Sequence, residues 1–362
     1  MDTQTIQRVR NGLNDPRIGP ETIALMLTRV CNFSCVYCRG GRPATKNNRT
    51  RNVADELATE ELFELLADAH ELQAKEINLG GMDGEPFCRM DIADIMTQIK
   101  KHCFTGSLTS NGSFLNVKMA KMMTDCGWDI LLLSLDAADA SIQQTLRPAH
   151  DGKPYFAGII EFLDFLNRNE SGLRILLNVV ISKLNYKQLP ELVKFADNYK
   201  NIESINVLKM LNMGLENYGD LQLNRQELNE FKSILFDLNS NKLKYLGNWL
   251  GDGDEKESGL SLRGAEISPL LREEPKRCYA NYYILSIDSN GDVIQCPQHQ
   301  KVIEGLNIRK TPLRELWANE HLQFRRKMAD YAYCFDECCT ILKEQNKLIY
   351  KNITPADIEK GR

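Results

Sequence analysis

Three cysteines near the N-terminus are spaced closely enough to hold one metal centre. Cys31, Cys35 and Cys38 stand in the segment Cys-Asn-Phe-Ser-Cys-Val-Tyr-Cys. Thiolates separated by three and two residues can wrap a compact loop around a single [4Fe–4S] cubane. Three ligands leave one iron of such a cluster without a protein ligand, and an open position is typical of catalytic metal sites. Structural zinc is the alternative, but it usually needs a fourth ligand, which this loop lacks.

A second group of cysteines lies toward the C-terminus. Cys278 is followed by twelve residues, then Gly291, four further residues and Cys296. The segment 289–292, Ser-Asn-Gly-Asp, separates two apolar runs and predicts a β-hairpin. Such a hairpin would bring the two thiols together.

The chain then offers three more thiols after a predicted helix over 312–331, at Cys334, Cys338 and Cys339. The crowding of these five cysteines predicts a second metal centre. Structural zinc at these thiols is the alternative.

Composition limits the classes of protein that this chain can belong to. Its 362 residues are 43% hydrophobic and 26% charged, which allows a sizeable core and argues against global disorder. The net charge is −4 and the sequence has no Lys/Arg run, so we expect no nucleic-acid partner. We find neither a signal peptide nor a membrane-spanning apolar stretch. Eleven cysteines in such a chain indicate metal binding in the cytoplasm rather than disulfides.

Strand-like apolar runs alternate with amphipathic helical patterns from residue 21 to about 240. The predicted strands are 22–30, 75–80, 105–110, 130–136, 174–182 and 204–211, and the helix over 59–72 is expected to begin with Thr59 as its N-cap. Six β–α units predict an α/β fold, a partial (β/α)6 barrel with right-handed crossovers. Functional residues of such a barrel gather at the C-terminal ends of the strands.

The same pass along the chain predicts five regions. They are an N-terminal extension (1–20), the barrel (21–246), a Gly-rich acidic linker (247–277), a small domain with a β-hairpin and a helix (278–340) and a C-terminal tail (341–362).

The cysteine loop after the first strand, with aromatic Tyr37 before its last cysteine, resembles the signature of the radical S-adenosylmethionine (SAM) superfamily. The resemblance implies that the open iron chelates the amino and carboxylate groups of SAM. It also implies reductive cleavage of SAM to methionine and a 5′-deoxyadenosyl radical, which abstracts hydrogen from substrate. Tyr37 would then lie near the adenine.

Further motifs at the strand ends resemble those of this superfamily. Residues 80–86, Gly-Gly-Met-Asp-Gly-Glu-Pro, are similar to its GGEP motif, which implies that backbone around Gly84 and an acid meet the SAM ammonium. Because Met82 and Asp83 interrupt the motif, both Asp83 and Glu85 stay candidates for that acid. The other implied SAM contacts are Ser110, Asn111, Ser134, Arg147 and Asn178, of which Arg147 would pair with the carboxylate.

The C-terminal cysteine spacing resembles the SPASM/Twitch domains of radical SAM enzymes. With five cysteines available, the resemblance implies one auxiliary [4Fe–4S] cluster. Its implied ligands are Cys278, Cys296, Cys334 and Cys338, with Cys339 as the substitute for the fourth ligand. We expect it to accept an electron from a substrate radical, and a flavodoxin or ferredoxin to supply the reducing electron for SAM cleavage.

We predict an oxidoreductase-like radical enzyme that acts on a small polar biosynthetic intermediate, such as a sugar, cyclitol or nucleoside. About 20 residues precede the first strand, too few for a leader-peptide recognition domain of the kind found in many peptide-modifying relatives. Maturation of a ribosomally synthesised peptide is the alternative. A non-catalytic Fe–S carrier and a zinc-binding module are further alternatives, and no catalytic acid or base is assigned.

Overall fold

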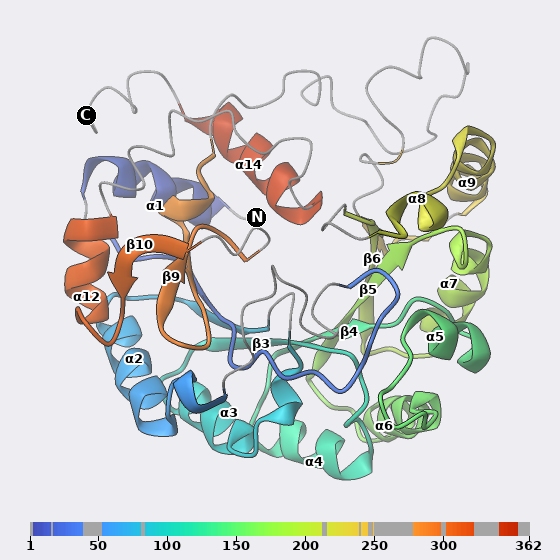
Figure 1. Ribbon diagram of the computed structural model, residues 1–362, viewed down its shortest axis with the longest axis horizontal. Helices are drawn as coiled ribbons and strands as arrows, with labels where there is room; N and C mark the ends of the chain where they lie inside the picture. Colours follow the sequence, from blue (N-terminus) through green and yellow to red (C-terminus); the bar gives the residue numbers. More distant parts are fainter. Residues whose placement is uncertain are drawn as a thin grey trace.

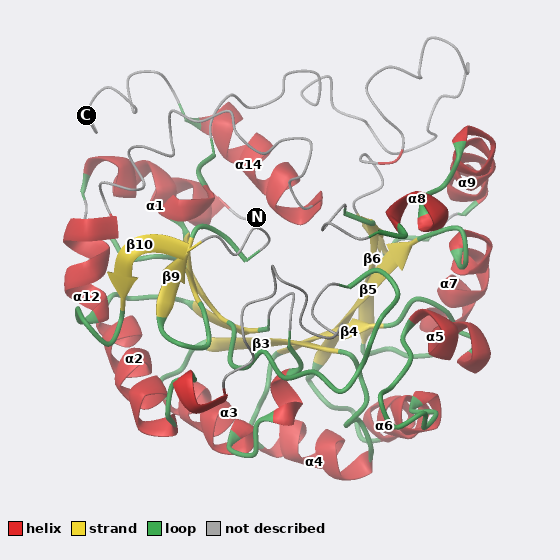
Figure 2. Ribbon diagram, viewed as in Figure 1, coloured by secondary structure: helices red, strands yellow, loops and turns green. Residues whose placement is uncertain are grey.

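The protein is described by a computed structural model that covers residues 3–15, 17–38, 53–80, 84–211, 216–238, 240–244, 249, 278–297, 302–321 and 340–353. Figures 1 and 2 show a strongly curved sheet with helices along its convex side.

Ten strands form one sheet in the order β10-β9-β8-β1-β2-β3-β4-β5-β6-β7. Neighbouring strands from β8 to β7 pair in parallel, and β9 and β10 are antiparallel additions at one edge. The strands are β1 (Thr22–Leu25), β2 (Glu76–Leu79), β3 (Thr105–Ser110), β4 (Ile130–Ser134), β5 (Arg174–Ile181), β6 (Ile202–Lys209), β7 (Leu243–Lys244), β8 (Ile284–Ile287), β9 (Asp292–Ile294) and β10 (Val302–Asn307).

The described helices are α1 (Thr3–Asn14), α2 (Thr59–Glu71), α3 (Ile92–Lys101), α4 (Val117–Asp125), α5 (Ala140–Leu146), α6 (Phe156–Arg168), α7 (Leu189–Asp197), α8 (Tyr218–Leu221), α9 (Arg225–Asp237), α12 (Leu313–Glu315) and α14 (Thr340–Asn352). Most helices connect successive parallel strands, while α1 precedes β1 and α12 and α14 follow β10. Short 3-10 turns are η1 (Val53–Asp55), η2 (Pro86–Cys88), η3 (Tyr186–Gln188) and η5 (Ala280–Tyr282), and a wider turn, η6 (Leu316–Glu320), continues α12.

The main core lies between the convex face of the sheet and these helices. In β5, Ile175, Leu177 and Val179 are buried on this face, while the residues between them are less buried on the concave face. Alternate residues of this apolar run are more buried because helices cover only the convex face of the sheet. In α6 the buried residues recur at helical spacing, at Ile159, Phe162, Leu163 and Leu166.

The C-terminal region extends the barrel sheet. β8 pairs in parallel with β1, and Gly291, with φ +85°, forms the turn into β9. Almost all of α14 falls in the predicted tail, yet its Ile349 is fully buried in one apolar cluster with Val9 of α1 and Tyr282. The first and last described helices therefore share a small second core.

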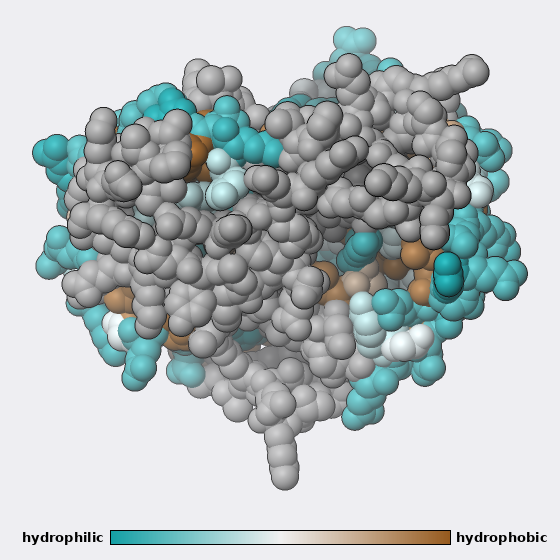
Figure 3. Space-filling view, turned by 90° about the horizontal axis from the view of Figure 1, so that it is seen from above, coloured by the Kyte–Doolittle hydropathy of each residue, from teal (hydrophilic) through white to brown (hydrophobic). Residues whose placement is uncertain are grey.

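The predicted fold class is confirmed, including the six β–α units and the C-terminal hairpin. The proposed regional boundaries stay a prediction. No helix among the described residues is long and apolar enough to cross a membrane. Figure 3 shows that described side chains at the rim of the face seen from above are mainly hydrophilic.

Candidate active site

The three N-terminal cysteines lie on the loop that follows β1, at the C-terminal edge of the parallel sheet. Cys35 is buried, and Cys31 and Cys38 are half-buried; all three belong to one apolar cluster that includes Phe33 and Leu146. Backbone hydrogen bonds fix the loop: Ser34 N donates to Pro148 O (2.8 Å) and Val36 N to Leu146 O (3.0 Å). The end of α5 thus holds the cysteine loop in place.

Arg147, which follows α5, forms a buried ion pair with Asp136 and also contacts one of these thiols. Its Nε and Nη2 donate to the Asp136 carboxylate at 2.6 and 3.3 Å, and its Nη1 lies 3.8 Å from Cys35 Sγ. The Tyr37 hydroxyl also donates to Asp136, and the guanidinium carbon lies 5.3 Å from the centre of the Tyr37 ring. Val180 N donates to the same carboxylate at 2.8 Å. Asp136 therefore connects Arg147, Tyr37 and Val180 in one hydrogen-bond network.

Asn111 makes a corresponding contact with another thiol. Its Nδ2 donates to Cys31 Sγ at 3.8 Å and to Asn32 Oδ1 at 2.9 Å. Its Oδ1 accepts from Ser113 N at 2.9 Å, which fixes the orientation of the amide.

Glu85 is buried and contacts the backbone of Asn111. Its carboxylate accepts from Ser110 Oγ (2.9 Å), Asn111 N (2.7 Å) and Phe87 N (3.3 Å). Gly84 before it packs so tightly that a Cβ would lie 1.9 Å from the Thr28 carbonyl oxygen. A side chain at position 84 would push this loop away from the cysteine loop. Asp83, the other candidate acid, lies outside the described residues.

Burial raises the pKa of Glu85 to about 7, against the hydrogen bonds that lower it. Because the folded pKa exceeds the ordinary value of 4.5, the protonated carboxyl stabilises the fold below pH 4.5 and this contribution is lost as the pH rises through 7. Urea denaturation across this range should show wild type losing up to about 3 kcal/mol relative to Glu85→Gln. Parallel pH profiles of the two proteins would contradict this assignment.

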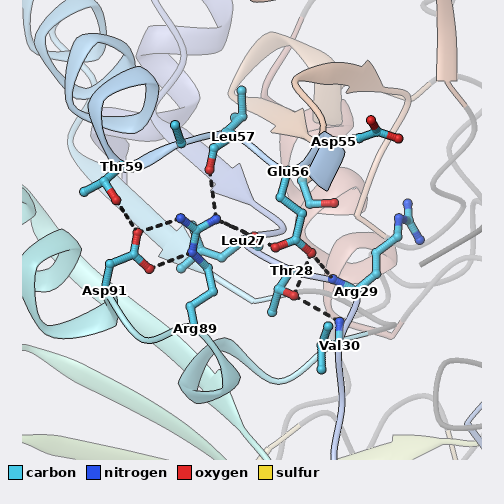
Figure 4. Close-up of polar contacts among 12 residues, drawn as sticks. Leu27, Thr28, Arg29, Val30, Asp55, Glu56, Leu57, Thr59, Arg89 and Asp91 are labelled. Carbon is cyan, nitrogen blue, oxygen red and sulfur yellow. Dashed lines mark hydrogen bonds and ion pairs between the residues drawn. The ribbon is translucent and has the colours of Figure 1, made fainter. Parts of the chain in front are cut away.

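The start of the cysteine loop is anchored from outside the barrel (Figure 4). Glu56 Oε1 accepts from the Thr28 hydroxyl at 2.7 Å and from Arg29 N at 3.2 Å, and Thr28 Oγ1 in turn accepts from Val30 N at 3.0 Å. The backbone that enters the loop is thereby held by one carboxylate.

Arg89 stabilises that carboxylate and ties together three segments (Figure 4). Its guanidinium donates to Leu27 O and Leu57 O at 3.1 and 3.0 Å, and pairs with Asp91 at 2.6 Å. It also lies 3.9 Å from Glu56 Oε2. On the other side, Arg29 pairs with Asp288 at the end of β8, an ion pair that links the cysteine loop to the C-terminal region.

Replacing Glu56 with alanine should loosen this anchor. The Thr28 hydroxyl and Arg29 N–H would lose their acceptor, and such unsatisfied groups cost about 1–3 kcal/mol. We expect a lower free energy of unfolding and less iron retained on desalting. Glu60→Ala, at an exposed position on α2, is the matched control and should change stability by less than about 0.5 kcal/mol. Equal effects of the two substitutions would contradict the anchoring role.

Ser134 and Asn178 are register partners at the C-terminal end of β4 and in the middle of β5. Both face the concave side, and Asn178 Oδ1 accepts from Asn206 Nδ2 at 2.8 Å. Ser134 lies two residues before Asp136 in the chain, and Asn178 two residues before Val180, whose N–H donates to Asp136. The structure therefore brings Arg147 and Asn111 to the thiols, and links Tyr37, Glu85 and Ser110 to these two residues through further hydrogen bonds. Contact of all these residues with SAM stays a prediction.

Cys31, Cys35 and Cys38 lie on one loop and in one apolar cluster, so the three thiols can belong to a single cubane. A cubane binds each thiolate through a different iron, so its ligands need not converge. Burial raises the pKa of Cys31, and raises that of Cys35 to about 12 against the opposing charge of Arg147, so cluster binding must release protons.

Comparison with known families agrees with this geometry. Residues 25–196 match the radical SAM superfamily and residues 278–340 match an iron–sulfur cluster-binding domain, SPASM. The chain belongs to the radical SAM enzymes that carry a SPASM-type auxiliary domain. Its cofactors are a [4Fe–4S] cluster, SAM and an auxiliary iron–sulfur centre in the C-terminal domain.

Among its relatives is a mycofactocin maturase, MftC, of Mycolicibacterium smegmatis, 24% identical over 88% of this chain and 74% of the relative. A probable GTP 3′,8-cyclase of Thermococcus kodakarensis is 29% identical over 48% of this chain, which spans about half (52%) of the cyclase. Streptococcus suis SuiB bound to its precursor peptide SuiA has the same fold, with a TM-score of 0.61, 17% identity, and 89% of this chain and 72% of SuiB covered.

Several residues of the site were not anticipated from the sequence. Asp136, the last residue of the predicted strand 130–136, was given no role, and Glu56, Arg89 and Asn32 gave no local signal. A charge directly after an apolar run is a usable signal, because a buried carboxylate requires a partner. Of the predicted auxiliary ligands, Cys278 and Cys296 flank the hairpin, and Cys334, Cys338 and the substitute Cys339 lie outside the described residues.

Proposed function

We propose that this radical SAM enzyme modifies a ribosomally synthesised peptide. The observation that carries the proposal is the reach of the similarity: the match to a peptide maturase extends over 88% of this chain, through both domains, whereas the match to a nucleotide cyclase covers 48%. The likeness to SuiB with its precursor peptide also spans both parts of the fold. These relations favour a peptide over the small hydroxylated intermediate that we predicted first.

Under this proposal the cluster and SAM supply a radical that abstracts hydrogen from the peptide. The residues of this chain would orient SAM: Asp83 or Glu85 would meet its ammonium, and Arg147 its carboxylate. Asn111 and Ser110 hold Glu85 at the strand end. We further propose that the auxiliary cluster takes up the second electron of a net oxidation and that flavodoxin or ferredoxin reduces the SAM-binding cluster.

The test is anaerobic turnover of the full chain with SAM and dithionite. Short peptides encoded beside its gene are supplied singly, with GTP and an aminocyclitol as small-molecule comparisons. We expect one peptide to change mass and to raise 5′-deoxyadenosine release in proportion to its modification. Stimulation by GTP or the aminocyclitol, with every peptide unchanged, would overturn the peptide assignment in favour of the small-molecule one.

A further inference from the structure

Two of the three loop thiols accept a hydrogen bond from a side chain held in one orientation. Arg147 Nη1 lies 3.8 Å from Cys35 Sγ while its Nε and Nη2 are held by Asp136. Asn111 Nδ2 lies 3.8 Å from Cys31 Sγ while its Oδ1 is held by Ser113 N. Arg147 and Asn111 are both 8% exposed. Neither donor can therefore turn away without breaking other buried hydrogen bonds.

The two donors have a common electrostatic effect on a cluster held by these cysteines. One-electron reduction makes the cluster more negative, and N–H groups directed at its sulfur ligands stabilise that form. Arg147 adds a positive charge, and its ion pair with Asp136 is oriented with the guanidinium toward the sulfur. Burial keeps water from screening these interactions.

We propose that Arg147 and Asn111 make the reduction potential of the SAM-binding cluster less negative by donating hydrogen bonds to the Cys35 and Cys31 thiolates. This is a role toward the cluster, separate from any contact with SAM. It rests on the assignment of Cys31, Cys35 and Cys38 as the cluster ligands. Asp136 and Ser113 act as positioning residues, because they fix the two donors. Reduction by a protein donor would be easier as a consequence.

The test is an EPR-monitored redox titration of the anaerobically reconstituted full chain without SAM. A small portion is then mixed with SAM, which identifies the N-terminal cluster by the change in its EPR signal. We expect more negative midpoint potentials in Arg147→Met and in Asn111→Leu, and the most negative in the double variant. Arg147→Lys should lie between wild type and Arg147→Met, because it keeps the charge but loses the planar guanidinium.

Arg168→Met, which removes an exposed arginine on α6, is the matched control and should keep the wild-type potential. Wild-type midpoints in Arg147→Met and Asn111→Leu, with full iron content, would overturn the proposal. If Arg147→Met loses its iron, Arg147→Lys and Asn111→Leu decide, and wild-type potentials in both overturn it. If the EPR signal of the wild type does not change when SAM is added, the assignment of Cys31, Cys35 and Cys38 as cluster ligands is wrong instead.

Discussion

Replacing Cys31, Cys35 and Cys38 with alanine is expected to abolish reductive SAM cleavage. The three thiols share one loop and one apolar cluster, and no other thiol completes the loop in the sequence. Without them the open iron that would bind SAM has no support. After anaerobic reconstitution, the triple variant should contain about four fewer irons per chain than wild type, the content of one cubane. It should release no 5′-deoxyadenosine with dithionite.

The matched control changes cysteines that lie away from the loop. Cys103 follows α3 and is exposed, and Cys126 caps α4. A Cys103→Ala/Cys126→Ala variant should keep its iron and its SAM cleavage. If the triple variant still cleaved SAM, or if wild type took up zinc in place of iron, the assignment of the SAM-binding cluster to this loop would be wrong. The auxiliary iron that persists in the triple variant reports on the C-terminal domain independently.

The barrel was predictable because its signals are local. Apolar runs such as 130–135 and 175–181 leave few alternatives to buried strands, and helical spacing of apolar residues defines the helices between them. Short α5 was missed, since seven residues carry too few turns to show a period. Thr59, expected as an N-cap, is instead the first residue of α2, and its hydroxyl donates to Asp91 at 2.6 Å. That partner lies 32 residues away and gives no local sign.

The candidate site was likewise predictable only where its signals are local. The cysteine spacing and strand-end motifs indicated Tyr37, Asn111 and Arg147 because family signatures are short segments of sequence. The contacts that hold them are made over long separations: Arg29 with Asp288, and Arg147 with Cys35. Such contacts depend on the order and curvature of the sheet, including the pairing of β8 with β1. Only a folded chain brings them together.

Breaking the Asp136–Arg147 ion pair should be among the most destabilising single changes in the barrel. The Asp136 side chain is 0% exposed and that of Arg147 8% exposed. Removing one partner leaves an uncompensated buried charge, at a cost of about 3–5 kcal/mol. We therefore expect Asp136→Leu and Arg147→Met each to lower the free energy of unfolding by this amount in urea denaturation. Burial keeps the pKa of Tyr37 well above its ordinary value, so its hydroxyl stays a donor to Asp136.

The double variant measures the coupling energy between Asp136 and Arg147 apart from their other interactions. Asp136→Leu/Arg147→Met removes both charges, so its loss of stability should be several kcal/mol smaller than the sum of the single losses. A loss of about 1–3 kcal/mol should persist, because Val180 N would lack its acceptor. The same cycle on Arg174 and Glu203, an ion pair with both side chains 52% exposed, should give coupling below about 1 kcal/mol. Additive losses at Asp136 and Arg147 would mean that the two side chains act separately and would contradict the role of this ion pair.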